Sequence, residues 1–503
     1  MEETLRAAVE GLQLVLSWPN IVYPVAGTAV AMLFAAAPGV SAVTLLALAI
    51  PLTLSWDPLS VVLLFGALVG GSTFTGSISA ILMNVPGTAP NAATVLDGHP
   101  MARAGRAKAA IACAAAASAL GSSFGILVLM LTLPFMRRLV LLLGPPEFLM
   151  LALWGLTTIV IVVRGAVIKG VALAGLGVLL ACVGFDPRSA DLRYTLGTSY
   201  LQDGVPLVPV FLGVFAVAEM MSLMLSETTT ISGRTRVEEL EGSASDGLRA
   251  VKENPGLLLR SSLIGTLIGA IPGIGGTVAS FTAYAHAARW YRKKDGHFGH
   301  GDIRGVLAPE AANDAKDGGS LIPVLAFGVP GSVGTALLLT ALLLHGLAPG
   351  PELLSNRLPL VFALIWALFL SNWLSSLTGL ALINQVTRLT VVRVEYLVPV
   401  VLSLAVTSAF IYRGNGIDVF AMFLFGLLGF FMKKHQWPRI ALVMGLVLGP
   451  VFEINFHLTR RLHELGRVDF WTRPIAMGLL LLIVLSFVPA LFHGYRYERG
   501  ARP

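Results

Sequence analysis

The sequence predicts an all-α polytopic membrane protein. Of its 503 residues, 13% are charged and 55% are hydrophobic, and the mean hydropathy is +0.79. Soluble domains carry about 25% charged residues. The hydrophobic residues form long blocks, whereas the strands of an outer-membrane barrel alternate apolar and polar residues. These observations exclude a water-soluble enzyme, a nucleic-acid-binding protein and a disordered chain, and they disfavour a barrel.

The apolar blocks predict roughly 10–13 membrane segments, since one span needs about 20 mostly apolar residues. Several blocks are short or broken by glycine and proline, so we expect some segments to be re-entrant or discontinuous. The blocks lie near 21–56, 59–85, 107–134, 139–163, 165–184, 205–225, 257–285, 320–347, 357–384, 395–413, 417–432, 438–456 and 474–492.

A polar stretch near the midpoint divides the chain. Residues 226–256 are polar and mixed in charge, and such a stretch cannot lie in hydrocarbon. We therefore expect a first transmembrane repeat at 1–225, a polar linker at 226–256 and a second transmembrane repeat at 257–503.

Two Pro-Gly pairs recur in the same order in both halves. Pro38-Gly39 matches Pro272-Gly273 at an offset of 234 residues, and Pro86-Gly87 matches Pro330-Gly331 at an offset of 244. Duplicated halves with interrupted helices at corresponding positions are typical of secondary transporters, many of them built from inverted repeats. The pattern favours a transporter over two rivals, a channel and an integral-membrane enzyme.

The breaks are candidate substrate sites because a Pro-Gly interruption exposes backbone N–H groups and the positive end of a half-helix. Such a site can hold a carboxylate. Any single serine or threonine nearby is explained as well by close helix packing or by a bond to its own helix. The pair of breaks favours function, and the predicted substrate-binding residues are Pro38, Gly39, Ser77, Ser79, Asn84, Pro86, Gly87, Thr88, Pro272, Gly273, Pro330, Gly331 and Ser332.

The segment 308–320, APEAANDAKDGGS, holds the candidate ion-coupling residues Glu310, Asn313 and Asp314. Their spacing would place all three on one helix face. Oxygen ligands near membrane depth can bind a sodium ion or carry a proton. The alternative is an aqueous loop, which Lys316 and Asp317 favour.

The remaining charged residues predict which loops are cytoplasmic and do not indicate a catalytic or binding site. The net charge of +7 comes from basic clusters beside the apolar blocks, which is typical of cytoplasmic loops. We expect no nucleic-acid partner, no cofactor and no metal beyond a sodium ion, and we expect the basic C-terminus to be cytoplasmic. Asp57 and Asp97 are expected to mark turns beside proline or glycine.

Two long motifs then suggest a family. GGSTFTGSISAILMNVPGTAPNAATVLDGHPMARAGRA (70–107) and FGHGDIRGVLAPEAANDAKDGGSLIPVLAFGVPGS (298–332) resemble the signatures of the TctA family, the large membrane subunits of tripartite tricarboxylate transporters. The chain departs from that family at Asn313-Asp314, where Asn-Asn is common, and at Pro38-Gly39-Val40-Ser41, where Pro-Gly-Leu-Gly is common.

The resemblance implies a symporter in the bacterial inner membrane that imports di- or tricarboxylates such as citrate. It would work with a small four-helix membrane subunit and a periplasmic solute-binding protein, driven by a sodium or proton gradient. The alternatives are a stand-alone carboxylate carrier and a transporter of another organic anion.

Overall fold

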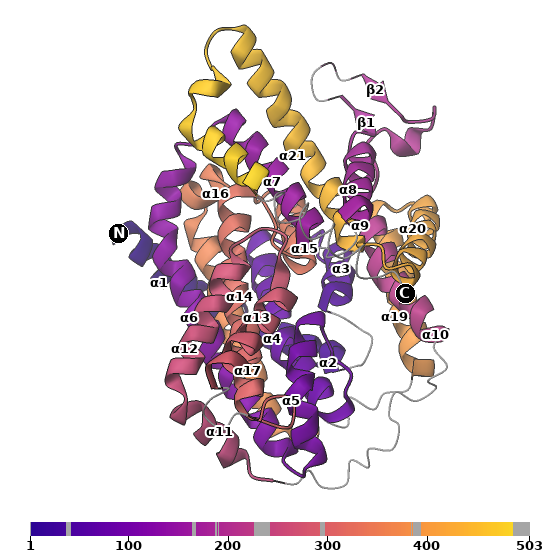
Figure 1. Ribbon diagram of the computed structural model, residues 1–503. Coiled ribbons are helices and arrows are strands. Elements are labelled where there is room, and N and C mark those ends of the chain that lie inside the picture. The colour runs from indigo at the N-terminus through magenta and orange to yellow at the C-terminus, as the bar shows by residue number, and fades with distance from the viewer. Residues whose placement is uncertain are drawn as a thin grey trace, which may run out of the picture.

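The computed structural model describes residues 2–36, 42–162, 167–186, 189, 191–225, 242–291, 297–383, 385 and 394–485. Across these ranges the chain is almost wholly helical, which confirms the all-α fold class (Figure 1). The described part contains one small antiparallel sheet, in which β1 (Gly184–Phe185) pairs with β2 (Leu192–Arg193).

The helices fall on either side of the polar linker. The N-terminal series is α1 (Glu2–Leu16), α2 (Val22–Ala36), α3 (Ala42–Leu52), α4 (Pro58–Met83), η1 (Ala89–Asn91), α5 (Ala92–Arg103), α6 (Ala107–Val140), α7 (Pro145–Val162), α8 (Val167–Ala181), η2 (Ser199–Leu201), α9 (Leu207–Phe211), the π-helical η3 (Leu212–Val217) and α10 (Ala218–Met224). The C-terminal series is α11 (Ala244–Glu253), α12 (Pro255–Gly269), α13 (Gly275–Tyr291), α14 (Arg304–Phe327), α15 (Val333–Leu344), α16 (Pro351–Asn356), α17 (Leu358–Ala381), α19 (Val394–Arg413), α20 (Gly416–Lys434), α21 (Arg439–Glu464) and η4 (Phe470–Thr472).

Seven helical stretches of the described chain are long and apolar enough to cross a membrane. They are Pro58–Met83, Ala107–Val140, Leu207–Met224, Leu358–Ala381, Glu395–Arg413, Gly416–Lys434 and Arg439–Glu464. Shorter apolar helices accompany them, as expected for a chain rich in breaks: Val22–Ala36, Ala42–Leu52, Val167–Ala181, Pro255–Gly269, Val333–Leu344 and Pro474–Leu485. The structure thus confirms the polytopic class, and the total of 10–13 segments stays a prediction.

The central bundle consists of α4 and α14 with their neighbours. The helix α4 packs mainly against α17 and α2, and α14 packs mainly against α6 and α12. Glycines allow these close approaches: a Cβ at Gly70 would lie 2.6 Å from Leu368 O, and one at Gly121 would collide with the backbone of Ala311. The helix α14, which carries Glu310, Asp314 and Asp317, is therefore enclosed by neighbouring helices.

A second group of helices lies beside this bundle, on the right of Figure 1. Within it α8 packs on α21, and α20 packs on η3 and α10. Glycine again sets the contact distance, because a Cβ at Gly213 would overlap Met422 O and one at Gly426 would lie 2.5 Å from Val217 Cγ1.

The polar linker is described only from residue 242 onward. Its described part forms α11, capped by Ser243, whose side chain accepts from the N–H of Ser245. The helix packs on α6 through Gly247, Ala250 and Val251, which are buried. This part of the linker is thus an amphipathic helix docked on the first half, and residues 226–241 lie outside the described residues.

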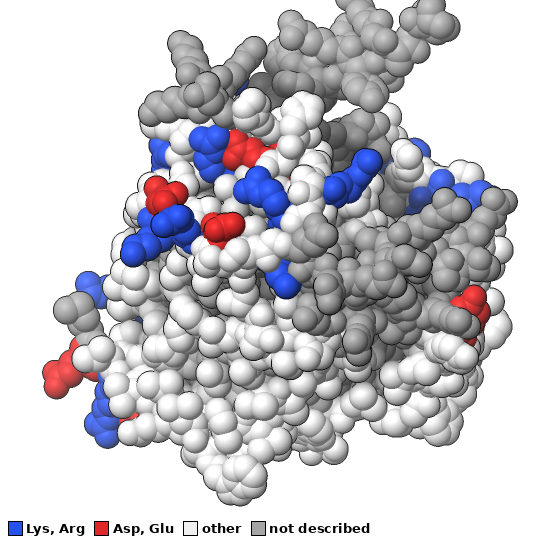
Figure 2. All heavy atoms as spheres, turned by 90° about the horizontal axis from the view of Figure 1, so that it is seen from below, with Lys and Arg blue, Asp and Glu red and all other residues white. Residues whose placement is uncertain are grey.

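Carboxylates that lie within or at the edge of apolar blocks mostly have partners. Glu219 pairs with Lys433 and Arg439, and Glu453 pairs with Arg193 at 2.6 Å. Figure 2 shows charged side chains gathered over part of one end of the molecule, while a broad area of the same face carries none. The ion pairs of Glu219 and Glu453 link segments of the two series, including strand β2 through Arg193, and indicate a structural role.

Candidate functional site

The first break folds back onto the helix that precedes it. Helix α4 ends at Met83, and Asn84 then adopts a left-handed conformation with φ 60°. The N–H of Gly87 donates to Gly76 O at 3.1 Å, and a Cβ at Gly87 would lie 2.5 Å from Gly76 Cα. Only glycine fits this contact, so the backbone of the break lies directly on α4.

Thr88 and Asn91 form hydrogen bonds in the part of this break that follows Gly87. Both the N–H of Thr88, at 3.1 Å, and its hydroxyl donate to Asn91 Oδ1. The Asn91 amide in turn donates to Ser77 Oγ at 2.7 Å. Of the predicted residues here, Ser77 faces this network, whereas the Ser79 hydroxyl donates to Gly76 O of its own helix.

The second break, like the first, follows a long helix that ends in a left-handed residue. Helix α14 ends at Phe327, and Gly328 is left-handed with φ 64°. Ser332 caps α15, accepting from the N–H of Thr335 at 3.2 Å, while Thr335 Oγ1 accepts from the N–H of Ser332 at 2.8 Å. A Cβ at Gly331 would lie 3.2 Å from Gly269 O of α12 and 3.6 Å from Ser320 Cβ, so this break lies against α12 as well as its own helix.

The other Pro-Gly pair lies beside the first break. Pro272 and Gly273 form the turn between α12 and α13, and Gly273 has φ 79°. Shortly after it, a Cβ at Gly276 would lie 2.9 Å from Pro90 Cγ and would overlap the Lys316 side chain. The matching Pro38 and Gly39 lie outside the described residues.

The segment 308–320 is a buried helical part of α14 and not the aqueous loop that was the alternative. Glu310 is 0% exposed, and both of its oxygens accept hydroxyl protons. Ser77 donates to Oε2 at 2.5 Å, Ser118 donates to Oε2 at 3.3 Å, and Thr94 donates to Oε1. Three helices, α4, α5 and α6, thus contribute donors to one carboxylate.

Two further carboxylates share this face of α14. Asp314 is 0% exposed, and its Oδ1 accepts from Asn372 Nδ2 of α17 at 2.7 Å. Asp317 Oδ2 accepts from Thr73 Oγ1 of α4 at 3.1 Å, and its Oδ1 pairs with Lys316. The side chain of Lys316 is 14% exposed, so this cation lies mostly inside the bundle.

Asn313 differs from its neighbours. Its side chain is buried, and neither Nδ2 nor Oδ1 has a hydrogen-bond partner among the described residues. Glu310 and Asp314, in contrast, bond to α4, α5, α6 and α17. Two of the three predicted ion-coupling residues therefore have hydrogen-bond partners on the surrounding helices, whereas Asn313 has none among the described residues.

Sequence reasoning missed the partners of this network and misread one residue. Asn91, Thr94, Ser118 and Asn372 stand alone among apolar or small residues, so only the fold brings them to α14. Asp97 was expected at a turn, but it lies inside α5 and is 0% exposed.

Asp97 anchors the loop that leads into α14. Its Oδ1 accepts the backbone N–H groups of Gly299, Gly301 and Asp302 at 2.8–2.9 Å, and its Oδ2 accepts the Tyr284 hydroxyl at 2.9 Å. In the same loop, burial alone would raise the pKa of Asp302, but the hydrogen bonds from Arg304 outweigh this effect and lower that pKa below its ordinary value. The hydrogen bonds of Asp97 thus fix the start of α14, the helix that carries the polar cluster of Glu310, Asp314 and Asp317.

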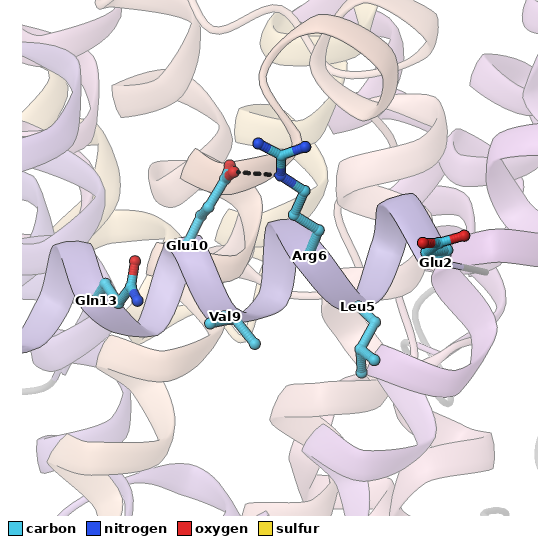
Figure 3. A pocket seen from close by; sticks show the side chains of 6 residues that line it. All are labelled: Glu2, Leu5, Arg6, Val9, Glu10 and Gln13. Atoms are coloured by element: carbon cyan, nitrogen blue, oxygen red, sulfur yellow. Dashed lines mark hydrogen bonds and ion pairs between the residues drawn. The ribbon is translucent and has the colours of Figure 1, made fainter.

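The hollow drawn in Figure 3 belongs to a different part of the surface. One face of α1 lines it, and the Arg6–Glu10 ion pair at 3.1 Å crosses it. Leu5 and Val9 are 70% and 50% exposed there. None of its lining residues belongs to the polar cluster, so it gives no argument for a substrate site.

Broken helices folded onto a buried polar helix, inside a bundle of membrane-spanning helices, are features of secondary transporters. The chain belongs to the tripartite tricarboxylate transporter TctA family, whose model matches residues 21–444. This confirms the family suggested by the two motifs. Membership makes the chain a component of a tripartite transport system, which includes other subunits.

Two relatives come from Agrobacterium vitis. An uncharacterized 52.8 kDa protein in the TAR-I ttuC' 3' region is 31% identical over 489 residues, covering 97% of this chain and 96% of that protein. An uncharacterized protein in the TAR-II ttuC' 3' region is 33% identical over 238 residues, covering 47% of this chain and 97% of that protein. No solved structure matches the chain.

Proposed function

We propose that the chain is the large membrane subunit of a secondary active importer of di- or tricarboxylates. A solute-binding protein in the periplasm would deliver the substrate, a small four-helix membrane subunit would complete the complex, and a sodium or proton gradient would drive uptake. The bacterial inner membrane is the corresponding location, with a cytoplasmic C-terminus. The observation that carries the proposal is the geometry of the two Val-Pro-Gly breaks around α14.

Contacts between α4 and α14 support a common centre for the two breaks. Thr73 meets Asp317 and Ser77 meets Glu310, so the two helices run in opposite directions past each other. Gly87 folds back to Gly76, three residues beyond Thr73, and Gly331 folds back to Ser320, three residues beyond Asp317. Three residues rise about 4.5 Å in a helix, which brings both breaks within less than one turn of the contact.

This arrangement suits a carboxylate with two or three acid groups. Each break would offer backbone N–H groups at the start of a half-helix, and the two breaks would take opposite ends of the anion. Lys316 lies beside the first break, since its stem is close to Gly276 and Gly276 in turn approaches Pro90, and its charge is paired with Asp317.

Helix packing also supports two structural repeats. In the proposed match, α1, α2, α4 and α6 correspond to α11, α12, α14 and α17. The main contacts then have counterparts: α4 packs on α17 as α14 packs on α6, and α1 packs on α17 as α11 packs on α6. Such exchange of partners is what a pseudo-two-fold axis between α4 and α14 would produce. It favours two repeats, and because α11 (Ala244–Glu253) matches α1, the second repeat would begin inside the segment 226–256 and not at 257.

Uptake of labelled carboxylates by cells that express the complete system tests the function. We expect uptake of at least one di- or tricarboxylate that needs both the binding protein and an ion gradient, and that ATP depletion alone does not stop while the gradient is maintained. Equal uptake without the binding protein would instead favour a stand-alone carrier. Uptake of none of the carboxylates, with transport of a different organic anion, would favour the other alternative.

A further inference from the structure

Three carboxylates lie along one face of α14 with too few cations to balance them. Glu310, Asp314 and Asp317 are each at most 4% exposed. Only Asp317 has an ion-pair partner among the described residues, Lys316. Buried charges need a partner of opposite charge or a proton, because their desolvation is costly.

Glu310 and Asp314 differ in how their oxygens are used. Both oxygens of Glu310 accept hydroxyl protons from Ser77, Thr94 and Ser118, which leaves no oxygen of that carboxylate unpartnered. Among the described residues, Asp314 accepts one hydrogen bond, at Oδ1, and its Oδ2 has no hydrogen-bond partner. The unbalanced acceptor on this face is therefore Asp314 Oδ2.

Asn372 presents a second unpartnered oxygen at the same place. The amide Nδ2 of Asn372 donates to Asp314 Oδ1 at 2.7 Å. The Oδ1 of Asn372 has no hydrogen-bond partner among the described residues. This assignment of the amide is the favourable one, since the reverse would turn two acceptor oxygens toward each other. Two fully buried side chains in direct contact thus each keep one acceptor oxygen without a proton donor.

The backbone of α4 passes close to this pair. A Cβ at Gly70 would lie 3.2 Å from the N of Asn372 and 2.6 Å from Leu368 O, so the two helices touch there without an intervening side chain. Gly70 is also the residue that matches Asp314 at the 244-residue offset of the two breaks. The first half therefore has no carboxylate at the corresponding position.

We infer that Asp314 Oδ2 and Asn372 Oδ1 are two ligands of a monovalent metal cation, sodium, bound between α14 and α17. A carboxylate and an amide oxygen are ligands that hard cations take. One carboxylate supplies the single charge that a monovalent ion needs, whereas divalent ions are held by several. Among the described residues no group of three or more His, Cys, Asp or Glu side chains could hold a metal ion, so a transition-metal site has no support.

The site would bind sodium whether or not the chain imports carboxylates. Its part in coupling, however, rests on the proposed function: bound sodium would neutralise Asp314 on the face of α14 that also carries Asp317 and Lys316. Sodium would then lower the electrostatic cost of placing an anion nearby. Because the matching position is Gly70, this account gives one such site per chain.

Direct binding to the purified full chain in detergent tests this inference. Radioactive sodium binding is measured at constant ionic strength, with potassium and choline chloride as the competing salts, at two pH values. Asp314→Asn keeps the shape but removes the charge, and Asn372→Leu removes the amide oxygen. Asn372→Asp keeps an oxygen at that position. Size-exclusion profiles check that each variant is folded.

Asp418→Asn is the matched control. Asp418 is also 0% exposed and accepts one proton, from the Tyr200 hydroxyl at 2.7 Å, and its other oxygen is unpartnered. It has no unpartnered amide oxygen bonded to it, so it should not bind sodium. Loss of this carboxylate shows what the removal of any buried acid does to the protein.

We expect saturable sodium binding to the wild type that potassium and choline do not displace. Asp314→Asn and Asn372→Leu should weaken it at least about tenfold, because each removes a ligand to a charged ion, while Asn372→Asp and Asp418→Asn should retain it. Absence of specific sodium binding to the wild type, or unchanged affinity in Asp314→Asn, would overturn the inference. Sodium binding without any carboxylate uptake would leave the site standing and refute the proposed function instead.

Discussion

The Thr73 hydroxyl donates to Asp317 Oδ2 at 3.1 Å, joining α4 to α14 across the centre of the bundle. Each residue precedes the proline of its own Val-Pro-Gly break by thirteen positions, since the prolines are Pro86 and Pro330. In the proposed repeats these two residues match, and matching residues that touch each other would lie near the axis that relates the repeats. This contact is therefore the point around which the two breaks, the three carboxylates and Lys316 are arranged.

Gly87→Ala should abolish uptake or prevent folding. The added methyl group would overlap Gly76 Cα, which is backbone and cannot rotate away. The space that a side chain would occupy is thus filled by α4 itself, and this is the reason that the position requires glycine. Gly334→Ala is the control, because its Cβ would meet its nearest neighbour only at 3.7 Å. Transport assays and size-exclusion profiles of both variants check the prediction, and similar behaviour of the two would contradict it.

Replacing Glu310 by alanine should destabilise the protein by at least about 3 kcal/mol, because three buried hydroxyls lose their acceptor and each unsatisfied group costs about 1–3 kcal/mol. Thermal unfolding in detergent measures this effect. Glu253→Ala is the control: its side chain is 64% exposed in an ion pair with Arg249, and exposed pairs contribute about 0–1 kcal/mol. A change at Glu310 as small as that at Glu253 would argue against the hydroxyl network.

Asp97→Ala should also destabilise by at least about 3 kcal/mol, because it leaves three loop N–H groups without their acceptor. Asp97→Asn should restore most of the loss, since all three N–H groups donate to one oxygen that an amide also provides. Asp57→Ala is the comparison variant: it removes the N-cap of α4, and losing such a cap destabilises a protein by about 1 kcal/mol. Proteolysis of residues 297–303 in Asp97→Ala, but not in Asp97→Asn, is the second readout. Equal stability of the two Asp97 variants would refute the anchor.

The lowered pKa of Asp302 predicts a loss of stability in acid. A carboxyl group whose pKa is lower in the folded chain than in the unfolded chain stabilises the fold above its unfolded pKa, near 3.8. That contribution is lost as the pH falls below about 4 and through the folded pKa. Asp302→Asn should therefore be less stable than the wild type at pH 7, with the difference shrinking toward pH 3. Parallel stability curves for the wild type and Asp302→Asn would contradict the prediction.

Sequence reasoning reached the fold class, the family and the positions of the breaks, because composition and Gly-Pro punctuation are local properties of the chain. It could not decide whether 308–320 is a loop or a helix. Lys316 and Asp317 look solvated in isolation, but they pair with each other inside the bundle. The partners of the carboxylates could not be predicted at all, since Asn372 lies 58 residues from Asp314 and Ser77 lies 233 residues from Glu310.

The central claim is that the two Val-Pro-Gly breaks bind one carboxylate substrate, and equilibrium binding of that substrate to purified variants tests it most directly. Thr88 and Ser332 hold the two breaks through their hydroxyls, which makes Thr88→Ala and Ser332→Ala the decisive pair. Each substitution removes a hydrogen bond that holds the backbone donors of its break in place, and the loss of a donor to a charged ligand costs about 1.5–3 kcal/mol, or roughly tenfold to a hundredfold in affinity. The account predicts a loss of that size in each variant, with folding retained. Wild-type affinity in both variants would contradict it.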